Sequence, residues 1–409
     1  MRSNLVVSIG ALVSVAAIST ACDGHRGAGH AEGVEARVPV SRAASPVQSP
    51  AMSASASLPI PSSAPSSAPA VLVPASASLS VAPAPSAIPT ATKVSVVVPR
   101  PGAPKTPVTV GNASGSDVLA GTHCQIFPAD NYWHADIRSL PVDSHNAAWL
   151  AAMGASTHNL HPDFGPSGDP SAPYGIPVTV ASAGQARVSV TFDYADESDQ
   201  VPYPLDAATR IEGGADASGD RHAIVVTADT CELFETWDTN ETAAGWTAGS
   251  GARWSLSSDS LRPDGWTSAD AAGLPILPGL LRVDEVAAGH VDHAIRFTTN
   301  RTEPAHLWPA RHDASSDDDT SLPPMGARFR LKASLDISRY NAETQVVLRA
   351  MQTYGLVLAD NGSPWYFQGT ADNAWSNSLI SQLKTIPANA FEAVDTSGLE
   401  ISPSTGASR

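Results

Sequence analysis

One long segment of this sequence limits most strongly what the chain can fold into. Residues 23–115 contain no Phe, Tyr or Trp and few charged residues, and proline recurs throughout, as in SSAPSSAPAVLVPASASLSVAPAPSAIP. Such a segment buries too little apolar surface to offset the conformational entropy lost on folding, and its prolines favour extended polyproline-II backbone. We therefore predict a disordered tether over residues 23–115, so a folded core must come from later residues.

The residues before the tether are typical of a secretion signal. Arg2 supplies the positive start, an apolar stretch runs from Leu5 to Ile18, and small residues lead into Cys22. The apolar stretch is too short to span a bilayer. The small residues before Cys22 resemble the bacterial lipobox, which implies cleavage before Cys22 and a lipid on its sulfur, with plain secretion as the alternative. Residues 1–22 thus predict an extracellular or cell-envelope protein, joined to a membrane only through this anchor.

The charge balance argues against one class of partner. From Ser116 onward the chain carries 17 Lys and Arg against 37 Asp and Glu. A surface this acidic repels nucleic-acid phosphates and anionic lipid headgroups. We therefore expect no nucleic-acid partner, and a soluble, monomeric domain.

The cysteines allow one bridge. If Cys22 carries a lipid, Cys124 and Cys231 are left as a pair, which in an oxidising compartment favours a disulfide. That bridge would close a loop of about 107 residues and stabilise the domain by about 4–5 kcal/mol in the chain-entropy model. Two separate buried thiols are the alternative.

Composition changes at about Ser116, where aromatic and acidic residues appear, and they persist to about Asp395. This span is long enough for one large domain and contains no second linker. We predict a globular domain over residues 116–396 and a flexible tail over residues 397–409.

Strands with period-two alternation dominate the domain, a pattern typical of antiparallel sheets with one solvated face. In the clearest example the alternation places Phe329 and Leu331 inside and Arg328 outside. The expected strands are residues 186–193, 222–229, 231–237, 252–258, 291–298, 327–335, 356–359 and 365–368, and the expected helices are residues 146–153, 341–354 and 377–385. The predicted class is mostly β with a few helices, arranged as a single β-sandwich-like or jelly-roll-like domain.

Several strings of the domain resemble a family of secreted bacterial proteins to which no activity is assigned. They are FPADNYW (Phe127–Trp133), FDYADESD (Phe192–Asp199), RPDGWTSADAAGLPILPGL (Arg262–Leu280), DEVAAG (Asp284–Gly289), WPARH (Trp308–His312) and YGLVLADNGSPWYFQG (Tyr354–Gly369). The resemblance spans residues 124–395, which supports a single domain. It implies no chemistry, so function must be inferred from the residues themselves.

Acids, Trp and His are densest in residues 261–298. Hydrolysis of a glycosidic bond requires two carboxyl groups about 5–9.5 Å apart, one of them protonated. Asp270, Asp284 and Glu285 are the candidates for this catalytic role. Because adjacent strand residues point to opposite faces, Asp284 and Glu285 would not act together, and one of them would pair with another acid such as Asp270 or Asp193.

Asp270 also has a structural interpretation. Thr267 or Ser268 can cap one helical turn at residues 269–272, which Gly273 would close. Asp270 would then only stabilise the positive end of that turn.

Four further residues are candidates for binding a substrate, namely Trp266, His293, Arg311 and His312. Trp266 lies in a turn and offers an aromatic face to a sugar ring. Arg311 and His312 follow a Trp-Pro bend, where they either contact a sugar or pin a loop. His293 lies on the apolar face of its predicted strand, where a hydrogen-bonded core histidine is the favoured interpretation.

A loop carries the spacing His158-x-x-His161-x-Asp163, which is compatible with a divalent metal and which His222 would complete. The pattern is weak because no third ligand is fixed beside the two histidines. The motifs of zincins, α/β-hydrolases and dinucleotide-binding proteins are absent from the sequence, and we predict no cofactor.

These residues favour a secreted or surface-tethered carbohydrate-active protein, a glycoside hydrolase that uses paired carboxylates. Two alternatives stay open. One is a non-catalytic β-sandwich that binds a glycan or cell-wall polymer, and the other is a metal-dependent hydrolase that uses His158 and His161.

Overall fold

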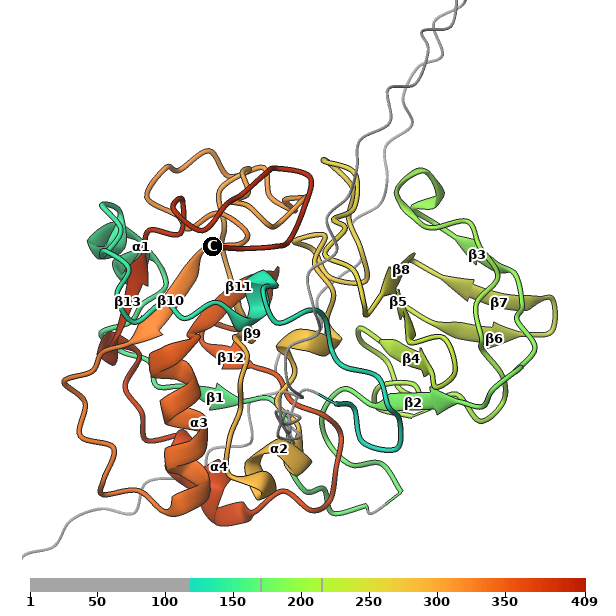
Figure 1. Ribbon diagram of the computed structural model, residues 1–409, viewed down its shortest axis with the longest axis horizontal. Coiled ribbons are helices and arrows are strands. Elements are labelled where there is room, and N and C mark those ends of the chain that lie inside the picture. The colour runs from blue at the N-terminus through green and yellow to red at the C-terminus, as the bar shows by residue number, and fades with distance from the viewer. Residues whose placement is uncertain (1–117, 170, 215) are drawn as a thin grey trace, which may run out of the picture. The chain divides into compact units, whose positions relative to one another are not determined.

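In the computed structural model, the described residues 118–169, 171–214 and 216–409 build three β-sheets (Figure 1). The six-stranded sheet has the order β1 (His161–Pro162), β12 (Tyr366–Phe367), β9 (Ile295–Thr299), β11 (Leu356–Asn361), β10 (Arg328–Leu331), β13 (Phe391–Val394). The four-stranded sheet has the order β2 (Val178–Ala181), β4 (Ala223–Thr227), β5 (Glu232–Trp237), β8 (Ser250–Ser255). The three-stranded sheet has the order β3 (Val190–Phe192), β7 (Gly245–Ala248), β6 (Asn240–Thr242). The predicted mostly-β class is confirmed.

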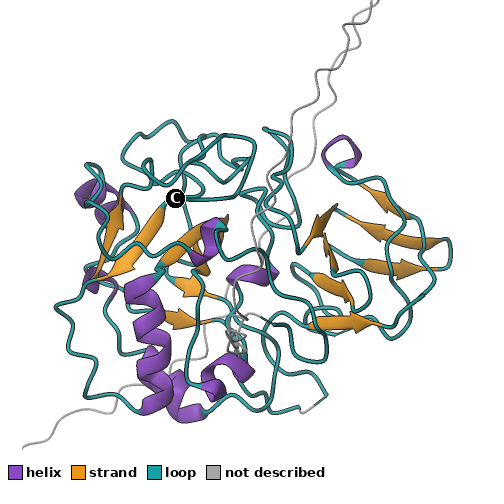
Figure 2. Ribbon diagram, in the orientation of Figure 1, coloured by secondary structure: helices purple, strands orange, loops and turns teal. Residues whose placement is uncertain are grey.

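Helices are few, and long loops connect the elements (Figure 2). The helices are α1 (Asn146–Ala152), α2 (Val283–Ala288), α3 (Ala342–Thr353) and α4 (Asn377–Leu383), with single 3₁₀ turns at η1 (Tyr132–His134), η2 (Ala195–Glu197), η3 (Leu277–Gly279) and η4 (Ala388–Ala390). The sequence predicted α1, α3 and α4. The side chain of Asn341 caps α3 by accepting the N–H of Thr344 at 2.8 Å, and Gly355 at φ +75° follows its end.

The sheets are mixed, whereas the alternating pattern predicted antiparallel pairing. The pairs β1–β12, β9–β11, β2–β4 and β3–β7 are parallel. Parallel neighbours need a long crossover. Between β9 and β11 the crossover includes β10 and α3, and α3 packs against the sheet (Figure 1).

The main core is centred on Trp365, which is fully buried. Its ring lies 5.6 Å from that of Phe297, 5.9 Å from that of Phe329 and 5.6 Å from that of Phe391. Its indole Nε1 donates to the carbonyl of Met153 at 3.0 Å, which satisfies the one polar atom of the side chain.

A second, smaller core lies between the four-stranded and three-stranded sheets, which form a small sandwich. The ring of Tyr203 lies edge to face with two others in this core. Its centroid is 5.4 Å from that of Phe192 on β3 and 5.3 Å from that of Phe234 on β5. The predicted hairpin of β4 and β5 forms the centre of the four-stranded sheet.

The predicted disulfide is confirmed. Cys124 and Cys231 are bonded across a sequence separation of 107 residues, which ties the start of the described chain to the residue directly before β5.

One prediction about exposure is wrong. Arg328 was expected on the solvent face of its strand but is fully buried, because its guanidinium donates to the carbonyls of Tyr354, Tyr132 and Ala135. These backbone carbonyls replace the water that would otherwise solvate the guanidinium charge.

Residues 397–409, for which a flexible tail was predicted, form hydrogen bonds with the rest of the domain. The carbonyl of Gly406 accepts the N–H of Tyr132 at 2.8 Å, and the indole of Trp308 donates to the carbonyl of Thr405 at 2.9 Å. These contacts are made largely by backbone groups, which do not require apolar side chains, so the sequence showed no hydrophobic pattern here.

The predicted signal, Cys22 and the tether over residues 23–115 lie outside the described residues. In the described part of the chain, no helix combines the length and the hydropathy needed to cross a bilayer.

Candidate functional site

Two neighbouring cavities lie beside the end of β11. The larger has a volume of about 310 Å³ and the smaller about 240 Å³. Asp220, Asp360 and Asn361 line both cavities, which we together call the cleft. Acidic side chains dominate its ionisable lining, namely Asp163, Glu197, Glu212, Asp220, Asp270 and Asp360.

A buried ion pair forms one wall of the cleft. Arg296 of β9 donates through Nε to Oδ2 of Asp270 at 3.0 Å and through Nη2 to Oδ1 at 2.7 Å. Both side chains are at most 2% exposed. The two-pronged geometry holds the carboxylate in a fixed orientation.

The segment that carries Asp270 is a turn, so the one-turn helix predicted there is wrong. Oγ of Ser268 accepts the N–H of Asp270 at 2.9 Å, and the N–H of Ala272 donates to the carbonyl of Ala359 on β11 at 2.9 Å. The Ser268 side chain thus bonds a nearby N–H, as in a turn, and the backbone bonds to β11 instead of forming the helix that Thr267 or Ser268 was predicted to cap.

Asp360 is a second carboxyl on the same guanidinium, with Oδ2 at 3.7 Å from Nη2 of Arg296. The pairing of β9 with β11 shifts register between Leu358 and Asp360, and such an irregularity re-aims side chains at a strand end. Burial and the negative charge of Asp270 raise the pKa of Asp360 to about 7, against the opposing charge of Arg296. Asp360 therefore exchanges a proton near neutral pH.

A histidine–glutamate pair lines the smaller cavity. His222 contacts Oε2 of Glu212 through Nδ1 at 2.6 Å and the carbonyl of Ala269 through Nε2 at 3.2 Å. Burial opposes charge on His222, but the hydrogen bond and charge of Glu212 outweigh it and raise the pKa of His222. Burial likewise raises the pKa of Glu212, and the bond from His222 outweighs it and lowers that pKa. The two form an ion pair.

Glu235 of β5 is a buried carboxyl that does not line the cleft. It accepts the N–H groups of Ile276 at 2.9 Å and Leu277 at 2.8 Å. Burial raises its pKa to about 7, although these two bonds oppose the shift, and the charge of Asp270 adds to it.

Aromatic side chains border the larger cavity. Tyr194 is 54% exposed, and its ring lies 6.3 Å from that of Trp237, which is half-buried. The indole of Trp237 donates to Oδ1 of Asp220 at 3.4 Å. A Cβ at Gly249 would overlap the indole ring, so glycine leaves the room that the ring occupies. An aromatic face beside acids is suited to the apolar face and hydroxyls of a sugar.

Of the residues predicted for catalysis or substrate binding, the structure brings two to the cleft, Asp270 and His312. Asp163 and His222, predicted as metal ligands, line its smaller cavity. Nδ1 of His312 lies 2.8 Å from the carbonyl of Ala271, and its Nε2 lies 3.8 Å from Oε2 of Glu197. Asp270 lines the cavity, but the ion pair with Arg296 takes up its carboxylate.

Asp284 and Glu285 lie on α2 and not on a strand, which corrects the geometry predicted for them. The carboxylate of Glu285 accepts the N–H of Arg282 at 3.1 Å and so caps the helix, and Gly289 in the left-handed region ends it. Glu285 is fully buried and forms an ion pair with Arg282, whereas Asp284 is only partly buried. Neither residue lines the cleft.

His293 is 3% exposed, with Nδ1 at 2.8 Å from the carbonyl of Ala294 and Nε2 at 3.2 Å from Glu285. The structure therefore places it as a hydrogen-bonded core histidine. It precedes β9, which begins at Ile295, and it does not line the cleft.

Trp266 and Arg311 also lie outside the lining of the cleft. Arg311 pins two loops, because its Nε donates to the carbonyl of Arg262 and its Nη1 to that of Pro403, each at 2.9 Å. Trp266 is half-buried, and the guanidinium of Arg262 lies 5.5 Å from its ring centre.

The proposed metal ligands do not converge. Nδ1 of His158 lies 2.8 Å from the carbonyl of Gly154, and the ring of His161 stacks on that of Tyr366 with centroids 3.9 Å apart. His158, His161 and Asp163 are not among the groups of described residues whose ligand atoms come within metal-binding reach of one another.

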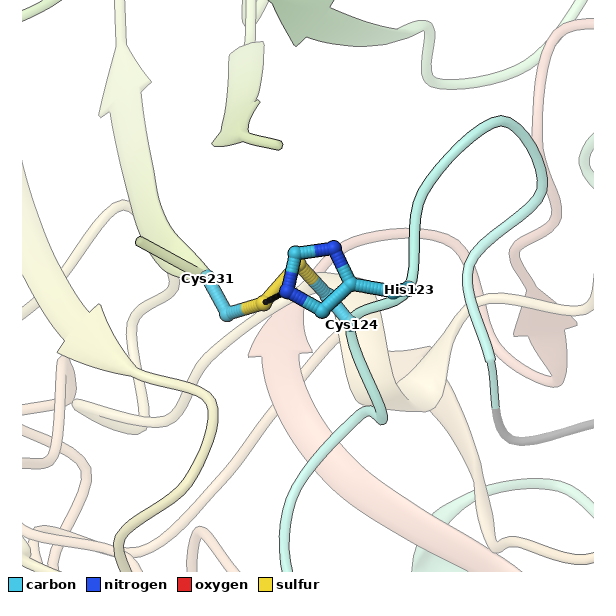
Figure 3. A group of neighbouring side chains, drawn as sticks. All are labelled: His123, Cys124 and Cys231. Carbon is cyan, nitrogen blue, oxygen red and sulfur yellow. Dashed lines mark hydrogen bonds between the residues drawn. A yellow bond between two sulfur atoms is a disulfide. The ribbon is translucent and has the colours of Figure 1, made fainter. Parts of the chain in front are cut away.

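One group of ligand-type side chains does converge in the described part of the chain, namely His123, Cys124 and Cys231 (Figure 3). Nε2 of His123 lies 3.7 Å from Sγ of Cys231. The two sulfurs are bonded to each other, so they offer no thiolate to a metal.

Sequence reasoning missed Asp360 as a site residue. Asp360 fell in the loop between the predicted strands 356–359 and 365–368. The available signal was an acid directly after the buried run Leu356–Ala359, since side chains at the ends of parallel strands commonly border sites. Asp220 and Glu212 lie in loops whose folding no local pattern predicts.

No family model, curated protein or solved structure matches this chain.

Proposed function

We propose that this protein is a secreted or surface-tethered carbohydrate-active protein whose cleft hydrolyses a glycosidic bond. One observation carries the proposal: Arg296 binds two carboxyls, and one of them, Asp360, lines both cavities and has a pKa raised to about 7. Glycoside hydrolysis needs such a protonated acid together with a second carboxylate.

In this mechanism Asp360 donates its proton to the leaving-group oxygen. Asp220 is exposed and also lines both cavities, and it acts as the second carboxylate, either attacking the sugar or activating water. Asp270 is a positioning residue, because its buried charge helps Asp360 to keep the proton. Tyr194 and Trp237 stack on the sugar.

The secretion signal and the lipid at Cys22 belong to the same proposal. The disulfide between Cys124 and Cys231 supports an oxidising compartment, because such bonds persist mainly outside the cytosol. A glycan or cell-wall polymer is the substrate that a tethered protein of this kind would meet.

The test is Asp360→Asn in the full chain, assayed by release of reducing ends from a panel of polysaccharides. We expect turnover to fall about 10³-fold, because the amide cannot donate the proton. Wild-type turnover should also fall about tenfold per pH unit above about 7, as Asp360 loses its proton.

The matched control is Asp318→Asn, which removes the same charge from an exposed residue outside the cleft and should turn over normally. If Asp360→Asn turns over at the wild-type rate, Asp360 is not the general acid.

The second candidate function is a binding module without catalysis. The exposed ring of Tyr194 beside Trp237 favours it, since an aromatic pair binds sugars with no help from a catalytic acid. Saturable glycan binding by the wild-type protein, with no reducing ends released at any pH, would establish this function instead.

A further inference from the structure

We infer that the glycan bound in the cleft carries free ammonium groups, as an oligomer of an unacetylated amino sugar does. This inference rests on the proposed function, because it names the substrate class of the same cleft.

The cations in the walls are already paired. The guanidinium of Arg296 is bound by Asp270 with a second contact to Asp360, and the imidazole of His222 is bound by Glu212. Neither is free to bind an anionic substrate.

Two carboxylates of the cleft have no such partner. Asp163 accepts a hydrogen bond from the hydroxyl of Tyr174, and Asp220 accepts one from the indole of Trp237. Among the described residues, neither Asp163 nor Asp220 has a cationic side chain within ion-pair distance. Their negative charge is therefore available to a ligand in the cavities that they line.

A hydrogen-bond acceptor in the smaller cavity, Oε1 of Gln368, also lacks a donor among the described residues. Gln368 lines the smaller cavity, is 6% exposed, and its Oε1 has no hydrogen-bond partner in the described part of the chain. Its Nε2 faces Oδ2 of Asp163 at 3.5 Å, and a carboxylate only accepts, so the amide oxygen is the atom left over.

Unpaired acids and a spare acceptor select a ligand that is rich in donors and positively charged. An ammonium group has three N–H donors and meets both requirements. Uronic acids and phosphate-bearing polymers would bring like charge to Asp163 and Asp220, so the same lining disfavours them.

The experiment measures calorimetric affinity and reducing-end release for the full chain with three probes of equal length: oligomers of glucosamine, of N-acetylglucosamine and of galacturonate. We expect the glucosamine oligomer to bind about tenfold more tightly than the acetylated one, and the galacturonate oligomer not to bind. Asp163→Asn and Asp220→Asn should each reduce the preference for glucosamine about fivefold, whereas Asp318→Asn should leave it unchanged.

The outcomes separate the two ideas. Cleavage of the acetylated oligomer with equal or tighter binding keeps the hydrolase and overturns the inference. Tight glucosamine binding without release of reducing ends keeps the inference and removes the hydrolase. Failure of every oligomer to bind overturns both.

Discussion

Two buried carboxylates in this domain are each paired with an arginine, but only one of them lies beside the cleft. Asp270 is bound by Arg296 beside the cleft, and Glu285 is bound by Arg282 and contacts His293. Both carboxylates are at most 1% exposed. In each group a second carboxyl lies 3.7 Å from the guanidinium, Asp360 from Arg296 and Asp284 from Arg282. Asp270 lines a cavity, whereas Glu285 caps a helix and lines neither cavity of the cleft. A buried ion pair with a second ionisable group beside it therefore does not by itself mark a site; free volume next to the pair does.

The largest expected effect separates these two groups. Asp270→Ala and Glu285→Ala should each lower the free energy of unfolding by about 3–5 kcal/mol, because each leaves a buried guanidinium without its close carboxylate. Only Asp270→Ala should also lower turnover per folded molecule, because its charge acts on Asp360. Urea unfolding and reducing-end release measure the two effects. Loss of turnover in folded Glu285→Ala would break the comparison.

Glu235 extends the comparison to a buried carboxyl without a cation. Its pKa is about 7 in the folded protein against 4.5 ordinarily, so between these pH values the unfolded chain releases a proton that the folded protein retains. Wild-type stability should therefore fall as pH rises from about 4.5 to about 7.

Glu235→Gln removes this loss. The free energy of unfolding of the variant minus that of wild type should therefore be about 2–3 kcal/mol larger at pH 8 than at pH 5. Urea unfolding at both pH values checks this. Identical pH dependence in the two proteins would show that Glu235 does not hold the proton.

Two tryptophans allow the same comparison between a residue that lines the cleft and one that does not, with a smaller expected effect. Trp237 lines the larger cavity and Trp266 does not. Trp237→Ala should weaken glycan binding about tenfold through loss of stacking, whereas Trp266→Ala should change the affinity less than about twofold. Titration calorimetry with one oligosaccharide measures both. Equal losses would place Trp266 in the binding surface after all.

The smallest effect is expected next to Glu285. Asp284 has a side chain that is 41% exposed and lies 3.7 Å from Arg282. Asp284→Ala should change the free energy of unfolding by less than about 0.5 kcal/mol and leave turnover unchanged. Thermal unfolding of this variant beside Glu285→Ala tests whether burial accounts for the difference between adjacent acids.

Much of the framework could be predicted from local pattern. The strand runs 222–229 and 231–237 contain the paired strands β4 and β5, and the helix predicted over residues 341–354 forms as α3. The pairing of Cys124 with Cys231 followed from parity and compartment. These features depend on residues close in sequence or on counting, so the sequence alone is sufficient for them.

The cleft could not be predicted in the same way. Asp270 was predicted either as a catalytic acid or as a residue that stabilises the start of a helical turn. Asp360 lay between two predicted strands and Arg296 lay within the predicted strand 291–298, yet the side chains of all three meet. Their meeting depends on the parallel pairing of β9 with β11 and on a register shift at the end of β11.

The sequence by itself determined which part of the chain can bury a core, its mostly-β character and its disulfide, because composition, period and cysteine count act locally. Only the tertiary structure decided which acids share a guanidinium and which border free space. Burial and proximity between distant residues set the pKa of Asp360, and neither quantity is written in the spacing of residues along the chain.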